Sequence, residues 1–290
     1  MSEVMQIPEL IDRVEELLSL PDVVIRANEL IDSEEADIDD IAEVIALDPS
    51  LSAQLLKLVN SAFYSFPSKI ETISRAIMVT GVNELRSLIM SASAVAVFNR
   101  IAPDIIDMDD FWFRSVYVGL AAKQVSGDRR KAEKMFLMGL LHDVGKIVLF
   151  SRDVDSANRI LAEAQTSSKK LYEIERDVLG YTISEVSAAL LESWGLAESL
   201  WRPIQAMYSD EPAADIANDA RILQLAARLA DCTDPDQQTT NEEFRALQQA
   251  TGLLEDTHVK PEELEEIMTE VNLYCFEVLS VINPDAALVF

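Results

Sequence analysis

Apolar residues recur every three or four positions along almost the whole chain, and this spacing constrains the fold more than any other feature. Near the amino terminus, for example, Leu10, Ile11, Val14, Leu17 and Leu18 fall on one side of a helical wheel. No stretch alternates apolar and polar residues over the length of a strand. The chain also has only 8 Gly in 290 residues, where an ordinary frequency would give about 20. The pattern therefore predicts an all-α fold and disfavours a turn-rich β-architecture.

Proline, glycine and small polar residues divide this pattern into separate helices. Pro49 excludes Asp48 from the α region, and we expect Ser50 to cap the helix that follows. Gly81 stands where a helix ends in a left-handed residue. The segment KAEKMFLMGLLHDVGKIVLF, residues 131–150, is expected to be helical.

The hydrophobic share of 49% is ample for a packed core. We expect three parts: an N-terminal helical part over residues 1–100, a helical core over 101–235, and an acidic C-terminal helical extension over 236–290. The seam between the first two is expected near residues 101–110, where Pro103 is followed by an acidic run.

The net charge of the chain disfavours nucleic acid as a partner. The formal net charge is −27, and nucleic-acid affinity comes largely from Lys and Arg on phosphates, so nucleic-acid binding is disfavoured. The one basic cluster, Arg129, Arg130, Lys131 and Lys134, is interpreted as the solvated start of a helix.

Compartment and redox state follow from the same composition. No stretch approaches the ~20 apolar residues of a membrane span, and the amino terminus lacks a basic leader region, so a cytoplasmic protein without membrane contact is expected. Cys232 and Cys275 lie far apart without CxxC spacing, which favours buried thiols over a disulfide.

The most specific motif is LLHDVGK, residues 140–146. Adjacent His142 and Asp143 at the end of an apolar helix can both turn toward one metal ion if the helix distorts, which Gly145 would permit. The apolar helix before the pair and the GK after it make the motif more specific than a lone His-Asp dipeptide.

With these residues the chain resembles the HD superfamily of metal-dependent phosphohydrolases, and more closely its HDOD branch. The resemblance covers about residues 15–232. It rests on DPSLSAQLLKLVNSAFYSFPSKIETISRAIMVTGVNELRSLI, FWFRSVYVGLAAKQV, MFLMGLLHDVGKIVLF, ISEVSAALLESWGL and ILQLAARLADC. It implies an all-α fold with N-terminal helices packed on an HD-type helical core. In a catalytic member it also implies a divalent ion such as Mn or Mg.

Four positions depart from the ligand set that the resemblance implies. Where that pattern has metal ligands, this chain has Arg114, Ile183, Tyr208 and Ala227. An arginine cannot ligate a metal. Besides His142 the chain has only His258, outside the resemblance. We therefore expect a degenerate site without a metal cofactor, in which Asp143 pairs with Arg114 and His142 hydrogen-bonds within the pocket.

Three functions stay open. The leading hypothesis is a bacterial-type, non-catalytic signal-transduction module that contacts a sensor kinase, response regulator or cyclic-dinucleotide enzyme. The alternative is a phosphohydrolase acting on a nucleotide or cyclic dinucleotide, with His142 and Asp143 as metal ligands. The third is a sensor of a small anionic ligand, with Arg114 as an anion clamp and Lys146 as a cation at the pocket edge.

Other candidate residues have simpler interpretations. Asn60 could bind a ligand, but it more simply ends a helix and fixes a turn. Ser115, Ser184 and Cys232 have no neighbouring His in the sequence to serve as a base, so a nucleophilic triad is not supported.

The C-terminal segment combines an acidic face with an apolar one. Its glutamates are 262, 263, 265, 266 and 270, and its apolar residues include Leu264, Val271, Leu273, Phe276 and Leu279. A helix packed on the domain is the plain interpretation, and a partner-docking or homodimerising helix is the alternative. Leu288, Val289 and Phe290 at the end of the sequence would suit docking into a groove.

Overall fold

The computed structural model describes residues 4–14, 18, 20–33, 36–61, 64, 66–99, 105–128, 131–233 and 240–283. The first half holds α1 (Ile7–Asp12), α2 (Asp22–Asp32), α3 (Ile38–Ala46), α4 (Pro49–Val59), α5 (Ile73–Thr80), α6 (Val82–Asn99), α7 (Met108–Ser126) and α8 (Ala132–Leu141). The second half holds α9 (Gly145–Arg152), α10 (Val154–Ala164), α11 (Leu171–Leu179), α12 (Ile183–Ser193), α13 (Glu198–Gln205), α14 (Ala217–Asp231), α15 (Thr240–Gln248), α16 (Thr251–Thr257), the 3₁₀ turn η1 (Pro261–Glu263) and α17 (Leu264–Ile282). Within these ranges there is no strand, so the predicted all-α class is confirmed.

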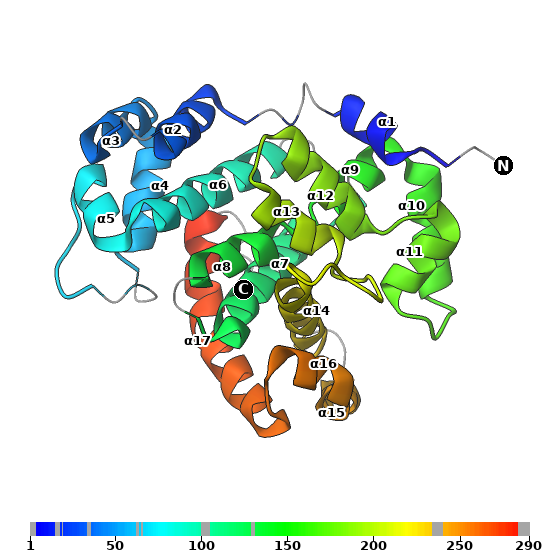
Figure 1. Cartoon of the computed structure of the whole chain (residues 1–290). Helices are drawn as coiled ribbons and strands as arrows, with labels where there is room; N and C mark the ends of the chain where they lie inside the picture. Colours follow the sequence, from blue (N-terminus) through cyan, green and yellow to red (C-terminus); the bar gives the residue numbers. More distant parts are fainter. Residues whose placement is uncertain are drawn as a thin grey trace.

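Helix α7 lies at the centre of the molecule, where it packs against α8, α14 and α17 (Figure 1). Helices α2–α5 lie on one side, and α6 connects them to the centre by packing on α8. Helices α9–α13 lie on the other side with α1 (Figure 1). One apolar core runs from Leu10 to Ile282. The N-terminal helices thus pack on the HD-like core as expected, and the boundaries near residues 100 and 235 stay a prediction.

Local sequence explains how the helix at residue 49 begins. Asp48 is extended, as expected, and its Oδ1 accepts hydrogen bonds from the backbone N–H groups of Ser50 (2.9 Å) and Leu51 (3.1 Å). Pro49 occupies the first helical position, where its missing N–H costs nothing. The expectation that Ser50 caps this helix is therefore wrong, because the aspartate two residues earlier reaches the same N–H groups. Gly81, with φ 90°, ends α5 as predicted.

The helical segment over residues 131–150 is divided in two. Helix α8 ends at Leu141, residues 142–144 form a turn, and α9 begins at Gly145. The glycine does not serve backbone distortion, since its φ is not positive. A Cβ at Gly145 would lie 2.5 Å from the carbonyl oxygen of Ile183 and 2.6 Å from the backbone nitrogen of Ser187. Gly145 therefore allows α9 and α12 to touch.

Polar contacts fix several of the helix junctions. Asn60 donates through Nδ2 to the carbonyl oxygens of Leu56 and Ile70, and its Oδ1 accepts from the N–H of Ile70, each at 2.7 Å. This confirms its role in ending a helix and holding the following loop. Trp112 is buried and donates through Nε1 to Asn99 at 2.8 Å.

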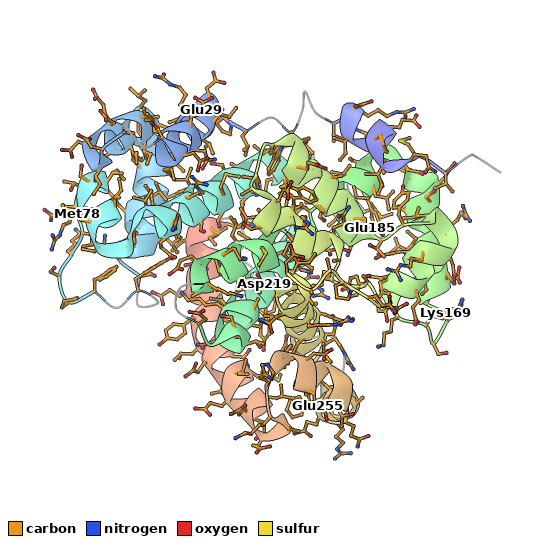
Figure 2. The ribbon with its side chains drawn as sticks, in the orientation of Figure 1. Glu29, Met78, Lys169, Glu185, Asp219 and Glu255 are labelled. Carbon is orange, nitrogen blue, oxygen red and sulfur yellow. The ribbon has the colours of Figure 1, made fainter. Side chains whose placement is uncertain are left out.

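The basic cluster near the start of α8 differs from expectation. Arg129 and Arg130 lie outside the described residues, but Lys131 and Lys134 donate to the buried carboxylate of Asp219, at 3.0 and 2.7 Å. Asp219 lies at the centre of the molecule, where α14 begins (Figure 2). The two lysines thus join α8 to α14 and are not only a solvated helix start.

Two further expectations concern composition. Both cysteines are free thiols and buried, as predicted. None of the helices in the described ranges has the length and apolar character that a membrane span requires.

Candidate functional site

The turn that carries His142 and Asp143 is held by a close crossing of α7 and α8. Gly119 and Gly139 face each other there, and a Cβ at Gly139 would lie 2.6 Å from the Cα of Gly119. The carbonyl oxygen of Gly139 is the partner of His142 Nδ1, at 2.6 Å. The small residues of the crossing therefore also position the imidazole.

His142 is 3% exposed, and burial lowers its pKa. A carbonyl oxygen can only accept a hydrogen bond, so the neutral ring carries its proton on Nδ1. This leaves the lone pair of Nε2 available. The hydrogen bond of His142 is thus to the backbone of its own helix, and its expected role within the pocket stays a prediction.

Arg114 comes from α7 and reaches the end of α14. Its Nη2 lies 2.6 Å from Oδ1 of Asp231, in a partly exposed ion pair. The sequence-based hypothesis gave Arg114 a different carboxylate, that of Asp143. Both carboxylates line the same cavity as the guanidinium, so the ion pair with Asp231 is established and a pairing of Arg114 with Asp143 stays a prediction.

These side chains surround one cavity of about 470 Å³. Its charged lining residues are Arg114, Lys146, Lys169, Lys170, Arg228, Asp143, Glu175 and Asp231. Five cations face three carboxylates, which gives a net formal charge of +2 with a neutral imidazole. In a chain with a charge of −27, the lining of this cavity is locally positive. Lys169 lies on the outside of the molecule (Figure 2), where it pairs with Asp177.

The other positions that depart from the implied ligand set line the same cavity. Ile183 opens α12 and is buried, Ala227 faces the cavity from α14, and the ring of Tyr208 stacks on that of Tyr172 with 4.5 Å between centroids. The positions that the resemblance singled out therefore line one cavity. None of these side chains is a usual ligand for a divalent ion.

The donor set does not fit the metal ion that the resemblance implies. Across the described part of the chain, no three His, Cys, Asp or Glu side chains are placed to hold one ion. Two carboxylates of the cavity are already engaged: Asp231 by Arg114, and Glu175, whose Oε2 accepts from the N–H of Ile183 at 2.9 Å.

Two groups of cavity residues escaped the sequence analysis. Glu175 of α11 is 4% exposed, and burial raises its pKa to about 7. Ala246 and Leu247 of α15 also line the cavity, so the C-terminal extension closes part of it. The charged neighbours of Glu175 in α11, Arg176 and Asp177, do not indicate that its side chain points inward. The i, i+4 spacing of Glu175 and the buried Leu179 was a usable signal.

The candidate nucleophiles have ordinary partners. The Ser184 hydroxyl lies 2.9 Å from that of Thr182, and the Cys232 thiol donates to the carbonyl oxygen of Arg228 at 3.2 Å. Ser115 is buried in α7.

Comparison with known proteins identifies relatives of this chain. The chain is 28% identical to an uncharacterized protein of Treponema pallidum over 197 residues, which are 67% of this chain and 38% of that protein. It thus spans well under half of that relative.

Three solved structures share the fold. A candidate phosphohydrolase from Shewanella amazonensis has a TM-score of 0.73 at 24% identity, with 94% of this chain and 97% of that chain covered. An HDOD domain protein with unknown function from Geobacter sulfurreducens has a TM-score of 0.71 at 22% identity, covering 96% of each chain. A candidate signal transduction protein from Marinobacter aquaeolei has a TM-score of 0.68 at 21% identity, covering 97% of this chain and 61% of that chain.

The family model of the HDOD domain matches residues 17–209, about two thirds of the sequence and the whole region from α2 to the cavity tyrosine Tyr208. This chain therefore belongs to the HDOD domain family.

Proposed function

We propose that this protein is a non-catalytic signal-transduction module of the HDOD type, which acts by contact with a separate protein. The observation that carries the proposal is the lining of the cavity that holds His142 and Asp143. There Arg114, Ile183 and Ala227 occupy positions at which the resemblance implies metal ligands.

The physical argument concerns the binding of a divalent ion. One imidazole and one carboxylate leave most coordination positions of such an ion to water, so binding is weak. A guanidinium in the same cavity adds repulsion between like charges. One solved structure of the same fold, described as a candidate signal transduction protein, supports a signalling role. A sensor kinase, response regulator or cyclic-dinucleotide enzyme would suit as partner, and the charge of −27 argues against nucleic acid.

We expect the purified protein to hydrolyse a generic phosphodiester, bis-(p-nitrophenyl) phosphate, no faster with Mn²⁺ or Mg²⁺ than the His142→Ala variant does. Asp143→Asn serves as a second variant that keeps the shape of the turn. Elemental analysis after dialysis is expected to find less than one metal ion per chain. Metal-dependent turnover that both variants abolish would instead establish the phosphohydrolase alternative.

A separate experiment tests the proposed contact with a partner protein. Affinity purification from the source organism is expected to recover one of the three partner classes, with the same yield from wild-type and His142→Ala protein.

A small-anion sensor is a second candidate, and the net charge of the cavity favours it. Five cationic side chains line a space of about 470 Å³ in an otherwise acidic chain, and two of them, Arg114 and Lys169, are paired with Asp231 and Asp177. Lys146, whose Nζ also lies 5.9 Å from the ring centroid of Phe150, and Arg228 are suitably placed for an anion.

For this candidate we expect inorganic pyrophosphate, at about ten times its dissociation constant, to raise the melting temperature by about 2–4 °C. Lys146→Gln combined with Arg228→Gln should remove the shift. Lys260→Gln, an exposed lysine outside the cavity, should retain it. An equal shift in all three proteins would assign the effect to nonspecific ion binding.

A further inference from the structure

The cavity beside the turn at residues 142–144 has hydrogen-bond acceptors at one end. His142 Nδ1 is bonded to the carbonyl oxygen of Gly139 at 2.6 Å, so the ring presents the lone pair of Nε2 as an acceptor. His142 is 3% exposed, and both it and Asp143 line the cavity. We call these two side chains the acceptor end. It would receive O–H groups of a bound molecule.

A second part of the lining, the cationic end, consists of Lys170 and Arg228, which both lie near Tyr172. The Nζ of Lys170 lies 5.9 Å from the centroid of the Tyr172 ring. Burial raises the pKa of Tyr172, and the charge of Arg228 is among those that oppose this rise. Among the residues that the structure describes, no ion pair joins Lys170 or Arg228 to a carboxylate. The two cations can therefore bind an anionic group together.

Two stacked tyrosine rings connect these ends. The rings of Tyr172 and Tyr208 are 4.5 Å apart between centroids and nearly parallel. Burial raises the pKa of Tyr208, the charge of Arg114 opposes this rise, and the charge of Asp143 adds to it. Tyr208 therefore lies toward the acceptor end, whereas Tyr172 lies at the cationic end. The lining changes from acceptors to cations across about 470 Å³, which is the size of a small-molecule site.

We propose that this cavity binds a phosphate monoester of a polyol, such as a sugar phosphate, with its phosphate at Lys170 and Arg228 and its hydroxyl groups at His142 Nε2 and Asp143. The proposal rests on the small-anion sensor described above and deepens it, since it names the class of ligand. Phosphate oxygens accept charge-assisted hydrogen bonds from Lys and Arg, and sugar hydroxyls donate to imidazole and carboxylate acceptors. Inorganic phosphate or pyrophosphate would occupy the cationic end alone.

Two probes separate the contributions of the ends. Glucose 6-phosphate and hexyl phosphate carry the same phosphate on six carbons, but only the first has hydroxyl groups. We expect glucose 6-phosphate to bind the wild-type protein about ten times more tightly than hexyl phosphate, because hydrogen bonds to a charged or buried acceptor add affinity. The measurement is isothermal titration calorimetry with EDTA present, so that divalent ions do not contribute.

Matched variants assign each end. Asp143→Ala should weaken glucose 6-phosphate about tenfold without weakening hexyl phosphate, because only the first ligand donates to that carboxylate. Arg228→Gln should weaken both ligands by a similar factor, since both carry the phosphate. Lys260→Gln, at an exposed lysine outside the cavity, should leave both unchanged. Should circular dichroism show that Asp143→Ala alters the fold, His142→Phe, which also removes an acceptor, is expected to give the same selective loss.

Equal affinities of the two ligands for the wild-type protein would overturn the proposal, as would an equal loss of both in the acceptor-end variants. If pyrophosphate still raised the melting temperature in that case, the small-anion sensor would stand and only the ligand class would be wrong. If neither these ligands nor pyrophosphate bound, both would fail. Release of phosphate from glucose 6-phosphate with Mn²⁺ would refute the non-catalytic function, whereas the binding results with EDTA would be unaffected.

Discussion

Replacing Gly145 by alanine is expected to lower the free energy of unfolding by about 3 kcal/mol and the melting temperature by about 6–10 °C. The added Cβ would lie 2.5 Å from the carbonyl oxygen of Ile183 and 2.6 Å from the backbone nitrogen of Ser187. Both are backbone atoms of α12, so no side-chain rotation relieves the overlap. Helices α9 and α12 would have to separate, which would also weaken the 2.9 Å hydrogen bond from the N–H of Gly145 to Ser187 Oγ.

The measurement is urea and thermal unfolding followed by circular dichroism. Gly252→Ala is the matched control, because a Cβ there meets nothing within 4 Å in α16. That variant should be unchanged or more stable by up to about 1 kcal/mol, the difference in helix propensity. Equal stabilities for the two variants would show that α9 and α12 do not approach this closely.

The sequence predicted the helices well because their main signal is local. Apolar spacing and breakers such as Pro49 and Gly81 act within a few residues, so α4 and α5 could be placed. The interruption at residues 142–144 was not predicted. Apolar residues are continuous on both sides of that turn, and the α12 backbone that Gly145 touches there lies about forty residues further along the chain.

In the candidate site, too, some features could be predicted from the sequence and others depended on contacts between distant residues. The HDOD resemblance placed Arg114, His142, Asp143 and Lys146 around one cavity, and the structure brings all four together. The pairing of Arg114 with Asp231 could not be predicted, because the two residues are 117 positions apart and two carboxylates were available. Periodicity likewise marked Leu273 as apolar, but it could not tell which side of α17 would face the domain.

Replacing Glu175 by glutamine is expected to stabilise the protein at neutral and alkaline pH by up to about 3 kcal/mol. Glu175 is 4% exposed, and burial raises its pKa from 4.5 to about 7. Between these values the unfolded chain has lost the proton that the folded protein retains, so the folded state binds more protons. Stability therefore falls as the pH rises from about 4.5 to 7, and this loss stays in place above pH 7. A glutamine carries no such proton, and its Oε1 can still accept from the N–H of Ile183.

The test compares the free energies of unfolding of wild-type and Glu175→Gln protein between pH 4 and pH 8. We expect the two curves to coincide near pH 4 and to separate as the pH rises, with the variant the more stable at pH 8. His142, whose pKa is lowered by burial, opposes this trend below about pH 6.5, but it is present in both proteins and cancels in the difference. Glu29→Gln, on the outer side of α2 (Figure 2), should leave the pH dependence of the wild-type protein unchanged. If Glu175→Gln were instead less stable than wild-type at pH 8, the ionised carboxylate would be a favourable partner for the cations of the cavity. The positive charge available to an anionic ligand would then be smaller than the lining residues indicate.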